Sequence, residues 1–211
     1  MLRLDVETII LMAPVILLAL TVHEFCHAWA AYRLGDDTAR LQGRLTLNPI
    51  AHLDIFGTIL FFIAGFGWAK PVPVNPLNLK DPKKDMMFIA FAGPASNVVM
   101  ALAAGLVIRV LIPMHLDINS PIIEMVFKLL MITVYLNLAL AVFNMIPLPP
   151  LDGSRILYGI LPREQANTYA QIEPYGVMIL FAIFIFGGRV FHTLIWYPIS
   201  ILVRLFSGLN F

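Results

Sequence analysis

The chain has 211 residues, of which 60% are hydrophobic and 13% are charged, and its formal net charge is +1. A soluble domain would carry about 25% charged residues. The composition therefore excludes an ordinary soluble globular protein and indicates an integral membrane protein. The near-neutral charge gives no reason to expect a nucleic-acid partner. The single cysteine, Cys26, excludes an internal disulfide framework.

The first apolar stretch, residues 9–34, is long enough for a membrane-spanning helix. It contains the sequence His23-Glu24-Phe25-Cys26-His27, an H-E-x-x-H motif. Residues four apart lie on one face of a helix, so His23 and His27 can present two imidazoles to one metal ion. Glu24, one step round the helix, is placed to take a proton from a water on that metal.

The alternative is that the motif occurs by chance on a helix surface. That alternative would leave two histidines and a glutamate in hydrocarbon without a purpose, which is costly unless they face a protein-lined, wet cavity. We therefore interpret them as a metal site. A catalytic zinc usually takes three protein ligands and leaves one position for water, so the third ligand must come from elsewhere in the chain.

Between the first span and the second lies a region of mixed character. Residues 39–49 alternate apolar and polar side chains around Gly43, a pattern that favours short strands at the membrane surface. Residues 50–68 hold an apolar run that is shorter than the roughly 20 residues of a full membrane span, which predicts a re-entrant or interfacial segment. The prolines at 71, 73 and 76 predict extended backbone. We expect a short membrane-associated β-hairpin or re-entrant region near residues 39–76.

The rest of the chain supplies further membrane segments. Residues 86–112 and 122–146 each predict a span, and 113–121 is a short connector between them. A last apolar stretch, 175–206, is interrupted at Gly187-Gly188 and could be one kinked span or two segments. The predicted fold is an all-α polytopic membrane protein with about 4–6 membrane segments.

Asp152 is the best candidate for the third ligand. It follows Pro147-Leu148-Pro149-Pro150, which forbids continuous helix at the end of a span. Its carboxylate could turn inward there, and two histidines with a carboxylate form a known catalytic zinc set. The alternative is that Asp152 caps the helix that begins near Ser154.

The motifs together resemble the site-2 protease family of intramembrane zinc metalloproteases. The resemblance covers about residues 15–160 and is carried by three motifs in the expected order: His23-Glu24-Phe25-Cys26-His27, Gly93-Pro94-Ala95-Ser96-Asn97, and Asn144 through Pro147 and Pro149 to Leu151-Asp152-Gly153.

The resemblance implies that His23, His27 and Asp152 bind one Zn²⁺ per chain and that Glu24 is the general base. It also implies that Asn97 and Asn144 line the site or hold the substrate's backbone; the alternative for each is that its amide only ties membrane helices together. The implied substrate is a transmembrane helix of another protein in the same lipid bilayer. Residues 1–211 would form a single metalloprotease domain, with a catalytic core at about 9–160 and C-terminal membrane segments at 175–206. Such a chain would be a minimal, core-only member, and its oligomeric state is not indicated.

Charge and catalysis make one joint prediction about topology. Basic residues gather in 33–49, 69–85 and 153–174, whereas the connector 113–121 has none. The positive-inside rule places these basic segments in the cytoplasm of a multi-pass cell-membrane protein, by inference prokaryotic, and the connector outside. The motif histidines and Asp152 must share a side, so 50–68 should not cross, and the zinc site should open toward the cytoplasm.

A second functional class competes with this interpretation. The chain could be a metal-binding membrane protein without peptidase activity, such as a metal carrier or an inactive adaptor. Transporters usually show repeated spans with ligands from both halves, and no such repeat is visible. Glu24 would also be superfluous for metal binding alone, so a Glu24→Gln variant separates the two classes.

Overall fold

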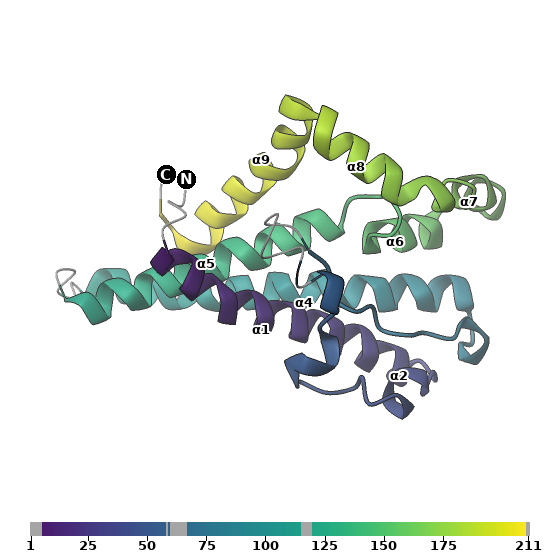
Figure 1. Ribbon diagram of the computed structural model, residues 1–211, viewed down its shortest axis with the longest axis horizontal. Coiled ribbons are helices and arrows are strands. Elements are labelled where there is room, and N and C mark those ends of the chain that lie inside the picture. The colour runs from purple at the N-terminus through teal and green to yellow at the C-terminus, as the bar shows by residue number, and fades with distance from the viewer. Residues whose placement is uncertain (1–5, 58, 60–66, 115–119, 210–211) are drawn as a thin grey trace.

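The computed structural model describes residues 6–57, 59, 67–114 and 120–209, and over these residues the chain is built from helices (Figure 1). The helices, in chain order, are α1 (Val6–Arg33), α2 (Thr38–Leu41), η1 (Pro49–His52), η2 (Pro76–Asn78), α4 (Pro82–Leu111), η3 (Ile112–Met114), α5 (Pro121–Asn144), α6 (Asp152–Ile160), α7 (Arg163–Ala170), η4 (Glu173–Tyr175), α8 (Gly176–Phe186) and α9 (Gly188–Ser207).

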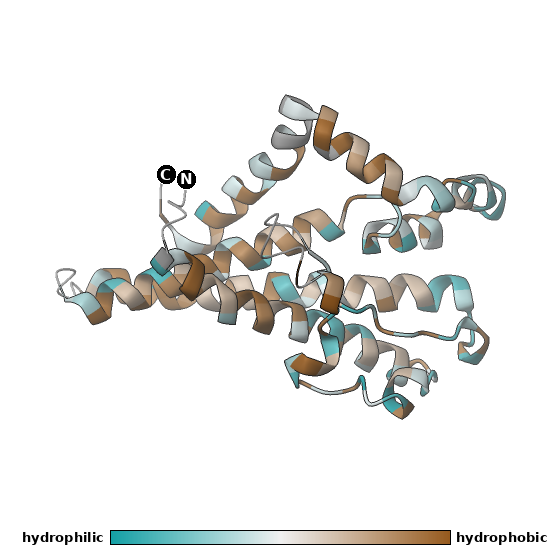
Figure 2. Cartoon of the chain, in the orientation of Figure 1, coloured by the Kyte–Doolittle hydropathy of each residue, from teal (hydrophilic) through white to brown (hydrophobic). Residues whose placement is uncertain are grey.

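Three of the described helices are long and apolar enough to cross a membrane, at Glu7–Arg33, Pro82–Met114 and Pro121–Asn144. Apolar residues run along all three, and hydrophilic residues gather at the end that carries α2, α7 and the start of α4 (Figure 2). This confirms a helical membrane protein. The expected count of about 4–6 segments is not confirmed.

The three long helices alternate in direction, with α4 packed against both α1 and α5. The side chain of Asn97 bonds the carbonyl of Ala19, and the Nδ1 of His27 bonds the carbonyl of Ile89, so α1 and α4 run antiparallel. Near the starts of α1 and α5, Lys128 donates to Glu7 over 2.9 Å. Helices α1 and α5 therefore run parallel, and both end on the same side of the molecule.

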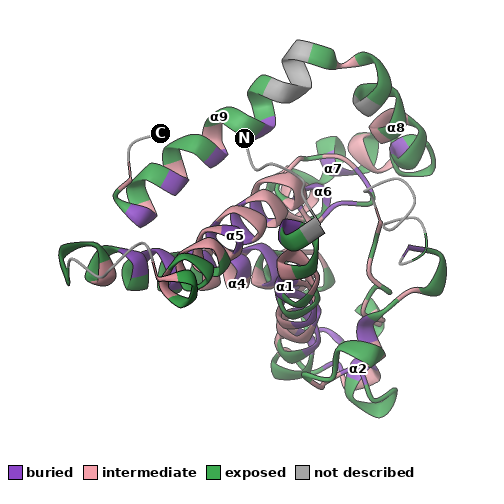
Figure 3. Cartoon of the chain, turned by 60° about the vertical axis from the view of Figure 1, so that its left-hand side comes forward, coloured by how far each residue is buried: buried purple, intermediate pink, exposed green. Residues whose placement is uncertain are grey.

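The main apolar core lies where α4, α5 and α9 meet. Its buried members are Ala101, Ala104, Ile108, Val134, Leu138, Ile195, Ile199 and Val203. The helices approach closely because α4 carries small residues there: a Cβ on Gly105 would lie 2.8 Å from the backbone oxygen of Phe206. Figure 3 shows the buried residues along the facing sides of these helices, whereas α8 is exposed along most of its length.

The C-terminal apolar stretch is two helices, α8 and α9, which meet at Gly187 and Gly188. Figure 1 shows them joined at an angle, with α9 descending toward the ends of α4 and α5 that lie away from α6. Arg109 of α4 fixes that arrangement by donating from its Nε to the carbonyl of Phe206 over 2.9 Å. Helix α8 spans only 11 residues, about 16 Å, which is too short to cross a bilayer alone.

The expectation of short strands over residues 39–49 is wrong. Residues 38–41 form α2, whose first amide donates to the carboxylate of Asp36, and Gly43 ends the turn at a φ of 68°. Pairing in the described part of 39–76 is limited to one antiparallel bridge between Leu53 and Ala69. The apolar residues of the alternating pattern do not form a buried strand face: Leu41, at the end of α2, and Leu47, in a bend, are both exposed.

The expected re-entrant segment 50–68 lies partly outside the described residues, which lack 58 and 60–66. Its described apolar side chains face outward: Ile50, Ile55 and Phe56 are each about three-quarters exposed. The two ends of the surrounding loop are in contact. Asp36 accepts a hydrogen bond from the amide of Asn75 over 2.7 Å and another from the side chain of Asn78 over 2.7 Å. The chain between residues 37 and 74 therefore returns to the side on which α1 ends.

Asp36 is the residue that closes this loop, and it is fully buried. Burial alone would raise the pKa of its carboxyl group, but the hydrogen bonds from Thr38, Asn78 and Asn75 outweigh burial and hold the pKa below its ordinary value. The carboxylate form is thus the one that the fold stabilises. The hydrogen bonds of this carboxylate fix where α4 begins relative to the end of α1.

The closed loop makes a testable topological prediction. Single cysteines in place of Leu41 and Leu77, which are 78% and 91% exposed, should be labelled from the same side of the membrane by an impermeant thiol reagent. A cysteine in place of Met114, beyond the far end of α4 and 59% exposed, should be labelled from the opposite side. All three belong in a Cys26→Ser background. Labelling of the first two from opposite sides would contradict this arrangement.

Candidate metal centre

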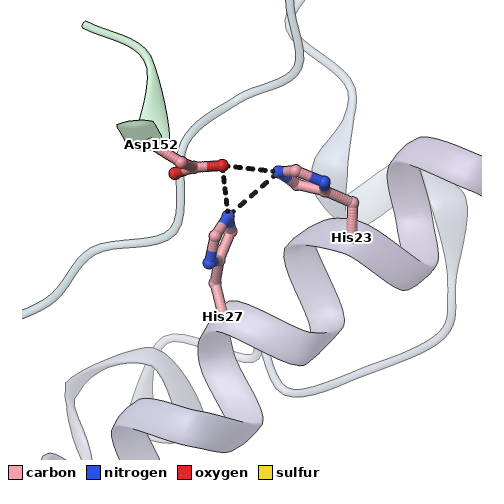
Figure 4. A group of neighbouring side chains, drawn as sticks. All are labelled: His23, His27 and Asp152. Carbon is pink, nitrogen blue, oxygen red and sulfur yellow. Dashed lines mark hydrogen bonds and ion pairs between the residues drawn. The ribbon is translucent and has the colours of Figure 1, made fainter. Parts of the chain in front are cut away.

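The two histidines of the motif lie on the inner face of α1, one turn apart and both buried. Their imidazoles are nearly perpendicular, at 85°, and their Nε2 atoms approach to 3.0 Å (Figure 4). The spacing of four residues in a helix produces this pairing, as the sequence predicted. Two ring nitrogens face one point from a single helix.

Asp152 completes the group from the other end of the chain. Its Oδ2 lies 3.1 Å from the Nε2 of His23 and 3.3 Å from the Nε2 of His27 (Figure 4). The prolines after α5 turn the chain so that α6 begins at Asp152, and the cap position of α6 is occupied by Leu151. The carboxylate therefore faces the histidines, and the helix-cap alternative does not describe its place.

Hydrogen bonds behind the rings fix which nitrogen of each imidazole is free. The Nδ1 of His27 lies 2.7 Å from the carbonyl of Ile89, which can only accept, so Nδ1 carries the proton. The Nδ1 of His23 lies 2.6 Å from the Oδ1 of Asn97 and donates to it in the same way. In the neutral form each Nε2 then offers a lone pair toward the shared point, the arrangement of metal-binding histidines.

The group fits a tetrahedral zinc ion. Zinc bonds of about 2.0–2.2 Å place neighbouring ligand atoms about 3.3 Å apart, and the three observed separations are 3.0, 3.1 and 3.3 Å. The Oδ2 of Asp152 is buried and has no hydrogen-bond partner. Three converging acceptor atoms would repel one another without a cation between them. They could therefore hold a metal, and they form a His-His-Asp group of matching geometry.

Gly93 determines how closely α4 approaches this group. A Cβ at that position would lie 2.4 Å from the Nε2 of His27 and 2.6 Å from the Nε2 of His23. Any side chain would displace the ring atoms that face the metal position. Sequence reasoning placed Gly93 in a family motif but did not assign it this role, because the approach of α4 to α1 is not visible in the chain order.

Glu24 is held by an extended strap, residues 69–75, that crosses beside the motif. The amide of Val72 donates to the Oε2 of Glu24 over 3.2 Å. The buried guanidinium of Arg44 anchors the strap, donating to the carbonyls of Pro71, over 3.1 Å, and Lys70, over 2.5 Å. Burial lowers the pKa of Arg44, and the nearby charge of Glu24 opposes that shift. The strap thus reaches Glu24 because Arg44 points inward.

His52 supports the same anchor and is itself buried. Its Nε2 lies 2.8 Å from the carbonyl of Thr46, and its Nδ1 faces Arg44 at 3.4 Å. Asp54, its neighbour in the sequence, accepts from the amide of Gly57. The anchoring roles of Arg44 and His52 were missed by sequence reasoning. An arginine between two turns has no local signal that its side chain points into the protein.

The two asparagines named from the sequence are placed differently. Asn97 is fully buried and touches His23, as described above. Asn144 is only partly buried, and its Nδ2 donates to the carbonyl of Leu140 within its own helix over 3.0 Å. The structure thus brings Asn97 to the ring of His23. The side chain of Asn144 instead bonds the backbone of its own helix, α5.

Comparisons with known proteins agree with this geometry. The model of the family described as Peptidase family M50 matches residues 110–187. The chain is 38% identical over 196 residues to the protein named "Putative zinc metalloprotease YwhC" of Bacillus subtilis (strain 168), covering 92% of this chain and 90% of that one. The chain belongs to the site-2 protease family, peptidase family M50.

Two proteins named "Putative zinc metalloprotease Rip2" are more distant. The one from Mycobacterium tuberculosis (strain ATCC 25618 / H37Rv) is 27% identical over 189 residues, which are 85% of this chain and 70% of that protein. The one from Mycolicibacterium smegmatis is 29% identical over 178 residues, which are 80% of this chain and 64% of that protein. The search of solved structures found no match.

Membership of the family makes the chain a membrane zinc metalloprotease with a protein substrate. Zn²⁺ is therefore its cofactor, and the His-His-Asp group is the candidate for holding it. The competing class, a metal carrier or an inactive adaptor, is not the one that the family and the named relatives support.

The convergence of three ligand atoms predicts zinc stoichiometry. Any single replacement of His23, His27 or Asp152 with Ala should reduce the zinc bound to the purified protein from about one ion per chain to a small fraction. The reason is that such a site needs three protein ligands. Elemental analysis of detergent-purified protein measures this. The matched control is Glu173→Ala, an exposed carboxylate remote in sequence from the group. Full zinc occupancy in Asp152→Ala would exclude Asp152 as a ligand.

The close approach at Gly93 predicts that a substitution which favours the helix will weaken metal binding. Gly93→Ala should favour the helix by about 1 kcal/mol in intrinsic propensity yet weaken zinc binding at least tenfold, because the new methyl group collides with both imidazoles. Zinc affinity by chelator competition and thermal unfolding of the metal-free protein measure the two effects separately. Unchanged zinc affinity in Gly93→Ala would mean that α4 does not press against the rings.

Proposed function

We propose that the protein is an intramembrane protease that hydrolyses peptide bonds within or near transmembrane helices of other membrane proteins. In this proposal His23, His27 and Asp152 hold one Zn²⁺, and Glu24 is the general base. The observation that carries it is the convergence of three ligand atoms within 4.8 Å of one another beside a helix long enough to span a membrane. A protease for soluble substrates would have no need for a site on a membrane span.

Glu24 performs the proton transfers in this mechanism. Bound zinc supplies Lewis acidity, which polarises the scissile carbonyl and lowers the pKa of water at the site. Glu24 takes the proton from that water and later gives it to the leaving amine. The amide of Val72 holds its Oε2, which orients the carboxylate and leaves its other oxygen to receive the proton.

The substrate must arrive unwound. A helix hides its carbonyls in hydrogen bonds to residues four positions on, so the helix must open locally before water can attack. The extended strap 69–75 is the part of the described chain beside Glu24 that could pair with an opened stretch. Residues 39–49, which were also expected to be extended, consist of α2 and turns and offer no such edge.

The depth of the site supports cleavage within the membrane. Trp29 and Tyr32 are exposed on α1, and Arg33 and Arg40 stack on them at 5.5 and 5.2 Å from the ring centroids. Tryptophan and tyrosine with flanking arginines gather at membrane–water boundaries. His27 and His23 precede the middle of this aromatic band by about four and eight residues, which places them about 6 and 12 Å inside it along the helix.

Orientation and organisation complete the proposal. We place the protein in the cell membrane with the N-terminus outside and the zinc site open to the cytoplasm, because the basic segments 33–49, 69–85 and 153–174 lie at the end with α2 and the start of α4. We treat residues 1–211 as one membrane domain with a catalytic core at about 9–160. Asn97 orients His23, and the family resemblance implies that Asn144 lines the site or holds the substrate's backbone.

Replacing Glu24 with Gln should abolish proteolysis and keep zinc, because Glu24 acts on water and does not ligate the metal. The measurement is the cleavage of a reporter carrying a transmembrane helix, together with the zinc content of the same preparation. A loss of at least a thousandfold is expected, since the base takes part in both proton transfers. Glu164→Gln, on the exposed face of α7, is the matched control.

Two outcomes would contradict this assignment. Cleavage retained by Glu24→Gln would remove Glu24 from the role of base. Zinc lost together with activity would make Glu24 a ligand or a support of the ligands.

A further inference from the structure

Asn137 of α5 is a fully buried amide in a membrane span, and no role was expected of it from the sequence. An unsatisfied amide there would be strongly destabilising. Both of its polar atoms are in fact bonded. Its Nδ2 donates to the carbonyl of Thr133 over 2.9 Å, and its Oδ1 accepts from the Nδ2 of Asn97 over 2.9 Å. Asn97 in turn bonds His23, a candidate ligand.

The two amides and His23 form a relay with a fixed direction. The carbonyl of Thr133 can only accept, so Asn137 must turn its NH₂ toward it and its oxygen toward Asn97. Asn97 must then turn its NH₂ toward Asn137, which leaves its own oxygen facing the Nδ1 of His23 at 2.6 Å. A second, longer bond from Asn97 to the carbonyl of Ala19, over 3.3 Å, agrees with that orientation.

We propose that Asn137 is a positioning residue for the metal centre: it holds the Asn97 amide in the one orientation that places the proton of His23 on Nδ1 and leaves Nε2 free to bind the metal. If Asn97 turned over, its NH₂ would face Nδ1. Nδ1 would then have to accept, and the proton would move to Nε2, where it blocks the lone pair. The inference rests on the proposed zinc site, because it assigns a function to the ring that Asn97 holds.

The simpler interpretation is that the pair of asparagines only ties α4 to α5. That interpretation predicts a loss of stability and no specific effect on the metal. The relay instead predicts a specific loss of metal affinity. Outer hydrogen bonds to ligating histidines are worth about 10–100-fold in metal affinity, and the effect should depend on what Asn97 is able to present to His23.

The first experiment compares isosteric variants of the full-length protein in detergent. Asn137→Leu keeps the branched skeleton of the side chain, though not its volume, and removes the acceptor; it should weaken zinc binding about 10–100-fold. Asn137→Asp, neutral when buried, can still accept from Asn97 and donate to Thr133, so it should bind zinc within about threefold of the parent. Leu138→Ala, in the same buried core, is the packing control: it should lower thermal stability and leave zinc affinity unchanged.

Spectroscopy provides a readout that packing alone would not change. With Co²⁺ in place of zinc, the visible absorption bands report the ligand set and its symmetry. Asn137→Leu should weaken or alter these bands, whereas Leu138→Ala should leave them unchanged. Equal zinc affinity and equal bands in Asn137→Leu and the parent would overturn the proposal, and so would losses of the same size in Asn137→Asp and Asn137→Leu.

A double variant tests the orientation itself and serves if single variants fold poorly. A carboxylate at position 97 has two oxygens and no NH₂, so it accepts from His23 whichever way it turns. In an Asn97→Asp background, Asn137→Leu should therefore cost no further zinc affinity. A full additional loss in the double variant would overturn the relay. Absence of zinc binding by the unmodified protein would instead reject the proposed zinc site.

Discussion

The hydrogen bond between His23 and Asn97 shows the constraint on which this structure depends: a polar group buried in a membrane helix must find its hydrogen-bond partner inside the protein. Neither imidazole has a polar partner on α1 for its Nδ1, and α4 provides both, through a side chain at Asn97 and through the carbonyl of Ile89. The antiparallel register of α1 and α4 is therefore set by the same bonds that orient the rings. The same hydrogen bonds thus determine both how α1 and α4 pack and how the imidazoles are oriented.

The site residues could be predicted from the sequence to the extent that their signal is local. His23 and His27 are one helical turn apart, and Asp152 follows a proline-interrupted segment, so each has a mark in the chain itself. Gly93 is marked only as part of a family motif, and Arg44 and Asn137 have no mark at all. Their roles arise only when α4 approaches α1, when a turn points a guanidinium inward, and when two spans meet, and periodicity in a single chain does not encode those contacts.

The wrong expectation of strands over 39–49 has the same origin. Alternation of apolar and polar residues predicts a strand when one face is buried against a core. Here the stretch has no buried apolar face: Arg44 points inward, whereas Leu41 and Leu47 are exposed. In a membrane protein the apolar surroundings can lie outside, so the usual assignment of apolar faces to the interior fails. The helical fold and the three long spans do not depend on that assignment, because length and hydropathy suffice for them.

If His23 and His27 lie just below a membrane boundary at Trp29 and Tyr32, as proposed, their position has a consequence for the fate of the two products. If the substrate is an opened membrane segment, a path of about 6–12 Å along extended chain corresponds to only about two to four residues. The fragment on the near side would keep too few apolar side chains to stay in the bilayer and would be released into water. The other fragment would retain most of its span and remain embedded. Each cut would thus detach a soluble domain from its anchor, and the mass of the released fragment would report the depth of the catalytic atoms.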